Sequence, residues 1–372
     1  ASGISRGMIM QSQAGINYVY SGQWDGVYAW QTDDDDGVGS GPTSVSLSGD
    51  FSANDNNLWQ WDIAYDSGGS SSLTVLGHPG QNLSHIDSDV NTPIMIGNFP
   101  YGSMTKLGTF TASCVLNSTT TITISPSNYL VGIGQTVTGT GIPASTTITN
   151  VTQTAGATTI TLSNAATSTS TQTLTFDNNL AVSGGVVMLY PYCFIYGNNG
   201  LIQNSSAGNF QNWVGADANQ NNVSATKVVK GMPLRGGTTS PAGLFWSTDQ
   251  LTRVTYSPQQ LGSSTIYWRY DIISTQTSIM SSQCVIEYDG IFYWVGVDRF
   301  LMYNGVVQEI PNSMNFNHFF DNINYAQRQK VWAMKIPRWG EIWWFYPRGD
   351  STECNDAVIY NVREKEIGRA HV

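Results

Sequence analysis

The chain has few charged side chains. Asp, Glu, Lys and Arg make up only 11% of its 372 residues, against roughly 25% in ordinary globular proteins. Gly, Ser, Thr and Asn fill the polar positions instead, and aromatic residues reach 12%. Disorder is not expected, because short apolar runs recur regularly along the chain. This composition is typical of rigid extracellular or virion β proteins.

Cysteine is also scarce, and long apolar runs are absent. The four cysteines, Cys114, Cys193, Cys284 and Cys354, form no CxxC pair and have no His-rich neighbour. This spacing excludes the usual zinc motifs and predicts free, mostly buried thiols. No apolar run approaches the ~18 residues of a membrane-spanning helix. We therefore expect no metal, no cofactor and no membrane span.

Basic residues are nearly missing from the first part of the chain. Residues 1–226 hold two basic and 13 acidic residues, whereas residues 227–372 hold 14 basic and 13 acidic ones, for a net charge of −10 overall. Such a chain offers no general basic surface to grip nucleic acid. An acidic wall could still let DNA slide past without adhering, and simple solubility is the alternative explanation.

Glycine-led strands recur in the second half. Gly200, Gly243, Gly290 and Gly340 each open a short apolar strand, at intervals of 43, 47 and 50 residues, and Gly26 opens a similar one. A period of about 40–50 residues with aromatic strands is typical of β-propeller blades. The sequence therefore predicts an all-β protein, a propeller of about six or seven blades. A complete propeller joins its first and last blades. We expect either that residues 4–10 supply the closing strand or that more chain exists than the given sequence.

The composition changes between residues 112 and 176, which contain no charged residue. Thr alternates there with Ile, Val or Leu, for example in residues 120–124 and 158–162. This alternation predicts antiparallel strands with one buried face. We expect a small β-sandwich or barrel inserted into the propeller, with residues 105–110 and 174–176 pairing as its connection. The predicted domains are 1–111, 112–176 and 177–372. A flexible Thr/Ser linker is the alternative.

Only residues 315–330 are expected to hold a short helix.

The acidic run Asp33, Asp34, Asp35 and Asp36 is the densest charge in the chain. Calcium loops need carboxylates at alternating positions with a distal acid, so this contiguous run does not fit one. We expect a solvated loop. If the protein forms a channel, these residues could instead face the lumen.

Other candidate residues have both chemical and structural explanations. The acids Asp298, Asp350, Glu353 and Asp356 could include paired glycosidase carboxylates. Asp249 and Asp298, however, each lie just beyond a glycine-led strand, where capping of turn amides explains them better.

The histidines His78, His85, His318 and His371 form no triad pattern, although the first two could meet across a hairpin. Residues 343–346, Trp-Trp-Phe-Tyr, could be a sugar-stacking platform but are better explained as a core strand. We predict no catalytic residues.

About half of the chain, from Asn178 onward, resembles structural proteins of tailed bacteriophages. It is most similar to the propeller-bearing tail-nozzle and packaged-DNA-stabilisation proteins of short-tailed phages. The resemblance rests on residues 183–187, 194–200, 227–237, 243–247, 289–305, 319–325 and 340–349. The predicted insert separately is similar to Thr/Gly-rich β modules of phage virion proteins, with a typical turn at residues 139–143.

The resemblance implies a location and partners. It implies a virion protein assembled in the bacterial cytoplasm, usually as a hexameric ring at the distal end of the tail. Adaptor, tail fibre or needle proteins would be its neighbours, and its lumen would retain or conduct DNA without reading its sequence. That family supplies no catalytic residues. The alternatives are a carbohydrate-binding or carbohydrate-cleaving phage adhesin, and a cell-surface adhesin in which the predicted insert is one of several repeats.

Overall fold

The structure, a computed structural model, describes residues 4–13, 16–32, 42–45, 58–65, 73–80, 95–98, 104–234, 240–311 and 315–371. Among these residues the chain is built from strands, with one α-helix and two short 3-10 helices. The predicted all-β class is therefore confirmed. The described segments form six four-stranded sheets and one six-stranded sheet.

The first three four-stranded sheets are numbered here in chain order. Sheet 1 contains β1 (Ser5–Gln13), β2 (Ile16–Gln23), β3 (Val27–Gln31) and β4 (Thr43–Ser44). Sheet 2 contains β5 (Gln60–Tyr65), β6 (Leu73–His78), β7 (Met95–Asn98) and β8 (Thr105–Lys106). Sheet 3 contains β15 (Gly185–Leu189), β16 (Tyr192–Tyr196), β17 (Leu201–Asn204) and β18 (Asn219–Asn222), with the 3-10 helix η1 (Asn198–Gly200) before β17.

The other three four-stranded sheets follow sheet 3 in the chain. Sheet 4 contains β19 (Val228–Leu234), β20 (Ala242–Ser247), β21 (Leu251–Leu261) and β22 (Ser264–Ser274). Sheet 5 contains β23 (Ile286–Tyr288), β24 (Ile291–Val295), β25 (Phe300–Tyr303) and β26 (Val307–Glu309). Sheet 6 contains β27 (Trp332–Ile336), β28 (Glu341–Tyr346), β29 (Asp356–Asn361) and β30 (Glu366–His371). The helix α1 (Asn315–Asn322) and the 3-10 helix η2 (Tyr325–Lys330) connect sheets 5 and 6, within the predicted helical segment.

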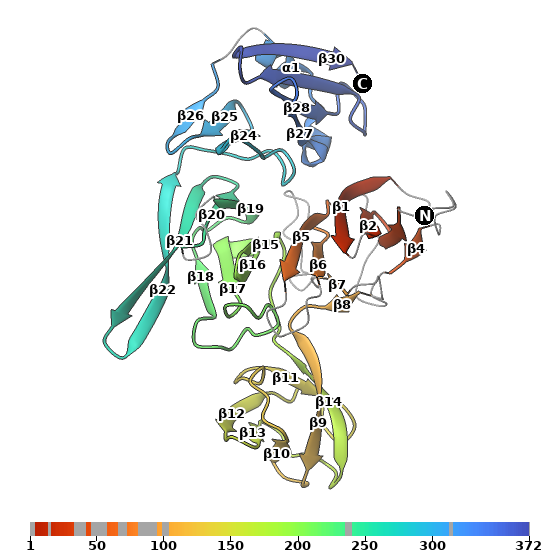
Figure 1. Ribbon diagram of the computed structural model, residues 1–372, viewed down its shortest axis with the longest axis vertical. Helices are drawn as coiled ribbons and strands as arrows, with labels where there is room; N and C mark the ends of the chain where they lie inside the picture. The colour runs from red at the N-terminus through yellow and green to blue at the C-terminus, as the bar shows by residue number, and fades with distance from the viewer. Residues whose placement is uncertain are drawn as a thin grey trace.

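Each of these six sheets is an antiparallel meander, with its strands hydrogen-bonded in chain order. In Figure 1 the sheets follow one another around a common centre, from sheet 1 at the right, through sheets 2, 3 and 4, to sheets 5 and 6 at the top. The first strands of consecutive sheets lie next to each other, as β5 does with β15 and β15 with β19. The first strand of each sheet is therefore the innermost one.

The glycine repeat marks strands that the structure contains, but some of these glycines precede the second strand of a sheet and others the third. Gly243, Gly290 and Gly340 lie at the start of second strands, whereas Gly26 and Gly200 precede third strands. Second strands in sheets 3 to 6 begin at Tyr192, Ala242, Ile291 and Glu341, at intervals of 50, 49 and 50 residues. Gly290 and Gly340 have φ of +82° and +72°, which is why glycine marks those hairpin turns.

Buried apolar side chains fill the seam between each pair of consecutive sheets. One cluster joins sheets 1 and 2 around Tyr20 and Trp59, and another joins sheets 2 and 3 around Leu76 and Ile195. A third joins sheets 3 and 4, and the largest joins sheets 4, 5 and 6. Trp246, Trp294 and Trp344 are fully buried in this largest cluster. Burial of these aromatic rings is the main apolar contribution to the ring's stability.

Among the described residues, the contact between sheets 6 and 1 is made by charged side chains and not by an apolar cluster. None of the apolar clusters formed by described residues includes members of both sheets. Instead, Arg6 of sheet 1 donates two hydrogen bonds to Glu353 of sheet 6, of 2.7 and 2.9 Å. We call the ion-paired group of Arg6, Glu353 and Lys330 the clasp. The expectation of a closing strand at residues 4–10 is wrong, because β1 pairs with β2 of its own sheet.

The inserted sheet is formed by β9 (Thr109–Leu116), β10 (Thr121–Ile124), β11 (Thr136–Thr138), β12 (Ile148–Gln153), β13 (Thr158–Leu162) and β14 (Thr171–Asp177). It curls so that its edges meet: the Ile148 amide donates to Gln135 and the Val137 amide to Thr146. The alternating strands bury Ile122 and Ile160 on its inner face. The single curled sheet is closer to the predicted barrel than to a two-sheet sandwich, and the flexible-linker alternative is wrong.

The connection to the inserted sheet follows the predicted pairing only in part. Residues 174–176 pair with 110–112, whereas residues 105–106 form β8 and pair with β7 of sheet 2. Phe110 of β9 lies opposite Phe176 of β14 in the register, and their rings stack at 5.1 Å. Lys106 forms an ion pair with Asp177 at 2.9 Å where the two strands leave the ring. The inserted sheet begins at Thr109 rather than at residue 112 and ends at Asp177 rather than at 176. In Figure 1 it projects from the bottom of the ring.

Candidate functional site

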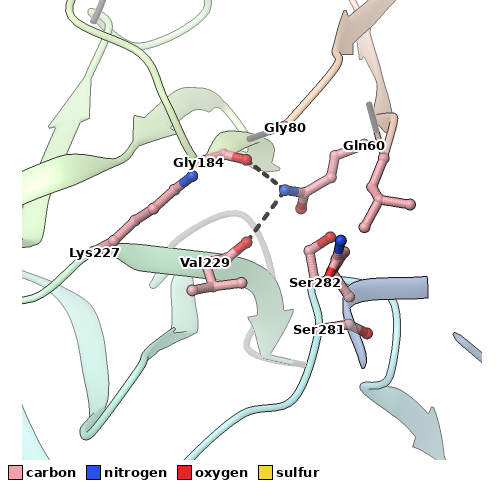
Figure 2. A pocket seen from close by; sticks show the side chains of 9 residues that line it. Gln60, Gly80, Gly184, Lys227, Val229, Ser281 and Ser282 are labelled. Atoms are coloured by element: carbon pink, nitrogen blue, oxygen red, sulfur yellow. Dashed lines mark hydrogen bonds between the residues drawn. The ribbon is translucent and has the colours of Figure 1, made fainter. Parts of the chain in front are cut away.

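The centre of the ring is closed. Residues in or next to the first strands of sheets 2, 3 and 4 converge there with residues before sheet 5 and with one residue of η2. They enclose a cavity of only about 10 Å³, close to the space that one water molecule needs. Its lining residues are Leu58, Gln60, Gly80, Gly184, Lys227, Val229, Ser281, Ser282 and Gln329. Figure 2 shows Gln60 reaching across this centre. This cavity is too small to hold a substrate.

Gln60 ties three sheets together at this closed centre. Its Nε2 donates to the carbonyls of Gly184 and Val229, the second at 3.2 Å, and its Oε1 accepts from the Tyr196 hydroxyl at 2.7 Å. A Cβ atom on Gly185 would lie 2.7 Å from both the Gln60 amide nitrogen and the Tyr196 hydroxyl. Glycine is needed there because the polar side chains pass so close to the backbone. The centre is thus a fully bonded structural junction.

The clasp joins sheets 6 and 1 through a single carboxylate. Lys330 donates to Glu353 at 2.9 Å and to the Thr352 carbonyl at 2.8 Å, while Arg6 binds both Glu353 oxygens. The Arg6 and Lys330 side chains are only 9% and 7% exposed, and that of Glu353 is 41% exposed. Hydrogen bonds from Arg6, and then from Lys330, lower the pKa of Glu353 to about 2. Glu353 therefore stays ionised throughout the physiological range.

A half-buried acid lies between sheets 2 and 3. The Asp62 carboxylate accepts hydrogen bonds from the amides of Met188, at 2.7 Å, and Ile63, at 2.8 Å. Burial raises its pKa, and the two amides and the charge of Lys230 only partly oppose this rise. Burial in turn lowers the pKa of Lys230. Asp62 bridges two innermost strands, which accounts for it structurally.

An open depression lies on the outer part of sheet 4, facing sheet 5. It is a groove of about 560 Å³, lined by Leu234, Ala242, Arg253, Thr255, Tyr256, Ser257, Arg269, Asp271 and Tyr303. We call it the sheet 4 groove. Arg253 and Thr255 on β21 lie opposite Asp271 and Arg269 on β22 in the strand register. Residues two apart on a strand share a face, so these four side chains project on the same side of the sheet.

Asp271 holds the two arginines of the groove in place. Arg253 donates to one carboxylate oxygen at 3.2 Å, and Arg269 donates through Nε to the other at 2.8 Å. Burial of Asp271 opposes its ionisation, but the two guanidinium groups outweigh this and lower its pKa. Two cations share one anion, so the group carries one net positive charge.

Most sequence-predicted candidates have structural partners. Asp298 pairs with the adjacent Arg299 at 2.7 Å, and Glu353 belongs to the clasp. Asp356 is buried and lies 3.6 Å from Arg348. Asp249 lies in the turn before β21, as expected, but accepts from the Thr226 hydroxyl rather than from a turn amide. Among the described residues, these contacts give no geometry for a pair of glycosidase carboxylates.

Of the remaining predicted residues, some lie outside the described part of the chain and the others have structural roles. Asp33, Asp34, Asp35, Asp36 and His85 lie outside the described residues. His78 is buried, and its Nδ1 accepts from the Gly80 amide at 3.0 Å. The strand of residues 343–346 is a core strand, as predicted: Trp344 and Tyr346 are fully buried, and Phe345 on the other face stacks on Trp332 at 4.2 Å.

The predicted thiol chemistry is confirmed. All four cysteines are free, and Cys114, Cys193 and Cys284 are buried. Burial raises the pKa of Cys114 to about 12. Within the described part of the chain no cluster of His, Cys, Asp and Glu could hold a metal ion, and no helix there is long and apolar enough to cross a membrane.

Sequence reasoning missed Gln60, the clasp and the sheet 4 groove. Gln60 bonds to residues 124, 136 and 169 positions away, and Arg6 to one 347 positions away. No local pattern reveals such partners. A signal for the groove was present: Arg253 and Thr255, and Arg269 and Asp271, are polar residues two apart on consecutive aromatic strands. That spacing places them on one face, provided that the hairpin register is known.

Comparisons with known proteins add little. No protein-family model matches the chain, and no curated protein matches it. Similar solved structures include the endosialidase of phage phi92, which is 12% identical with a TM-score of 0.31; the match covers all of this chain and 57% of that one. The intramolecular trans-sialidase of Ruminococcus gnavus is 10% identical with a TM-score of 0.31, covering 99% of this chain and 83% of that one.

A protein of Bacteroides fragilis, described as exported, is 10% identical with a TM-score of 0.29, covering 85% of this chain and 77% of that one. This chain thus spans little more than half the length of the phage enzyme that it matches. TM-scores near 0.3 and identities of 10–12% support no statement about activity.

Proposed function

We propose that this chain is a non-catalytic structural subunit of a bacteriophage tail, a nozzle or hub protein that works as an oligomeric ring. The six meander sheets are then the blades of a six-bladed β-propeller, and the inserted sheet is an accessory domain. The observation that carries the proposal is the closed axis, where Gln60 and its backbone partners leave about 10 Å³. A centre filled in this way leaves no room for a substrate on the axis, as expected of a propeller whose centre is structural.

The closed axis also determines where DNA could pass. A duplex cannot pass through a single subunit whose centre holds one water-sized cavity. A DNA-conducting lumen must therefore lie between copies of the chain. The chain's acidic balance, with a net charge of −10, suits a wall that DNA passes without adhering.

Exposed apolar residues on the innermost strand of sheet 1 support an assembly between copies. Met8 and Met10 share a face of β1 and are 62% and 61% exposed. Trp332 and Met334 on β27, the innermost strand of sheet 6, are 39% and 36% exposed. Large exposed apolar side chains are often found at contacts between proteins. We assign the face of β1 to the contact with a second copy.

The variant Met8→Glu/Met10→Glu is expected to abolish ring assembly. Two carboxylates on β1 would have to be desolvated in the contact, whereas in the free subunit they would remain in water. Analytical ultracentrifugation and negative-stain imaging of the purified protein measure the loss directly. Val306→Glu, at an equally exposed apolar residue in a sheet 5 turn, is the control and should still assemble.

Two outcomes would contradict this assignment. Rings that persist in the double variant would remove β1 from the contact. A double variant that is much less stable as a monomer would show instead that Met8 and Met10 pack within the chain, against sheet 6. Wild-type protein that forms only monomers, in solution and in the particle, would overturn the proposed function itself.

Carbohydrate binding is the second candidate, and the sheet 4 groove favours it. The groove is a large open depression that carries arginines, hydroxyls and an aromatic wall. Cleavage is not proposed, because the acids described above already have structural partners. A tail protein can both assemble and bind host glycans, so the two candidates are compatible.

A further inference from the structure

We infer that the sheet 4 groove binds an acidic saccharide through the carboxylate of its sugar ring. This inference deepens the carbohydrate-binding candidate and does not depend on ring assembly. It rests on the arginine pair of the groove, on the donors that this pair leaves unused, and on the groove's size and walls.

The arginines are oriented but incompletely satisfied. Asp271 occupies one terminal nitrogen of Arg253 and the Nε of Arg269. The Nε of Arg253 is buried and has no hydrogen-bond partner in the described part of the chain. A buried donor without an acceptor is costly, and the Arg253 side chain, which is 40% exposed, can turn this donor towards a ligand oxygen. The side chain of Arg269 is 67% exposed, which leaves its terminal nitrogens open to a ligand.

The charge of the group selects one carboxylate. Two guanidinium groups around one carboxylate leave one net positive charge, which a single ligand carboxylate neutralises. Arginine is suited to this role because its planar fork binds a carboxylate through two parallel hydrogen bonds. A phosphodiester chain fits less well, because its closely spaced charges would meet Asp271 and the acidic remainder of the chain.

The other walls match a sugar ring. Thr255 and Ser257 line the groove beside the arginines, and their hydroxyls can donate to or accept from sugar hydroxyls. Leu234 and Ala242 form an apolar part of the lining, and Tyr303 of sheet 5 forms the facing wall. The groove volume of about 560 Å³ lies within the roughly 300–1,000 Å³ of small-molecule sites. The groove lies between two rigid sheets, so little ordering is needed on binding.

The experiment uses an array of immobilised oligosaccharides that contain uronic or nonulosonic acids, each beside its carboxyl methyl ester. The purified full chain is tested together with Arg253→Gln, Arg269→Gln and the control Arg299→Gln. Arg299 pairs with Asp298 in a turn of sheet 5 outside the groove, so the control removes the same charge elsewhere. Arg269 is largely exposed, so Arg269→Gln should fold even if Arg253→Gln does not.

We expect at least one acidic oligosaccharide to bind, the matching ester to bind at least tenfold more weakly, and each groove variant to lose at least tenfold in affinity. Arg299→Gln should bind like the wild type. A short DNA duplex is included as a competitor and should not displace the saccharide at physiological salt.

Three results would overturn the inference. The first is that no acidic oligosaccharide binds at concentrations up to about 1 mM. The second is that the esters bind as well as the acids, or that the groove variants bind like the wild type. The third is that the DNA duplex competes, which would assign the groove to nucleic acid. None of these results bears on ring assembly, so failure here and failure of the structural role are distinguishable.

Discussion

Replacing Gln60 with Leu is expected to destabilise the protein by about 3 kcal/mol. Leucine fills a similar volume but leaves the buried Tyr196 hydroxyl without its acceptor and the Gly184 and Val229 carbonyls without a donor. Each buried polar group that loses its partner costs about 1–3 kcal/mol. Because Gln60 joins sheets 2, 3 and 4, the loss is concentrated at the centre of the ring.

Urea unfolding, followed by tryptophan fluorescence, measures this change. Gln308→Leu on β26, an exposed glutamine, is the matched control and should change stability by less than about 0.5 kcal/mol. Tyr196→Phe completes a double-mutant cycle. The Gln60→Leu/Tyr196→Phe pair should cost less than the sum of the single variants, because both partners of the 2.7 Å bond are then removed. Additive effects would show that this bond does not couple the sheets.

Replacing Glu353 with Gln is expected to be nearly as disruptive, at about 2 kcal/mol. The change leaves the two nearly buried cations Arg6 and Lys330 side by side without their shared carboxylate. Breaking a fully buried pair costs about 3–5 kcal/mol, and the figure here is lower because Glu353 is 41% exposed. The clasp joins sheets 6 and 1 where no apolar cluster does, so the ring should open at this seam first.

The same variant predicts a specific pH dependence. The pKa of Glu353 in the folded protein is about 2, below its ordinary value of 4.5. The carboxylate therefore stabilises the fold fully above about pH 4.5, and this contribution is lost as the pH falls towards 2. The difference in unfolding free energy between wild type and variant should shrink between about pH 5 and about pH 2.

The control for the clasp is Asp298→Asn, which removes a carboxylate from the exposed Asp298–Arg299 pair. This change should cost less than about 0.5 kcal/mol and show little pH dependence. Hydrogen exchange adds spatial detail: amides of β1 and β27 should exchange faster in Glu353→Gln than those of β19. Equal stability of wild type and Glu353→Gln at neutral pH would show that sheets 6 and 1 are held by other contacts.

The sequence predicted the strands and the class of the fold because the relevant signals are local. Gly290 and Gly340 adopt positive φ in hairpin turns, so the repeat has a direct physical cause. Alternation in residues 158–162 predicted β13 and its buried face, because side chains on a strand alternate between its two sides. The repeat wrongly placed Gly200 at the same position in its sheet as the later glycines, because Gly200 precedes a third strand. A glycine indicates a turn but does not identify which turn of the sheet it is.

The contacts that close the ring could not be predicted in the same way. Gln60 and Glu353 are ordinary polar residues in the sequence, and their partners lie in other sheets. Only the ring arrangement brings Arg6 to Glu353, and no spacing rule connects them. The Asp298, Glu353 and Asp356 carboxylates illustrate the converse, because in the fold each is explained by a nearby cation. The strand pattern predicts which face of its own sheet a residue occupies. The role of the residue depends on the neighbouring sheet that it contacts, which the pattern does not predict.

Cryo-electron microscopy of intact phage particles, with this protein identified by a fused label, tests the proposed function most directly. The account predicts a ring of copies at the distal end of the tail, with six-sheet subunits around a lumen that lies between subunits. Density for this protein only as single copies without contacts between them, or its absence from the particle, would contradict the account.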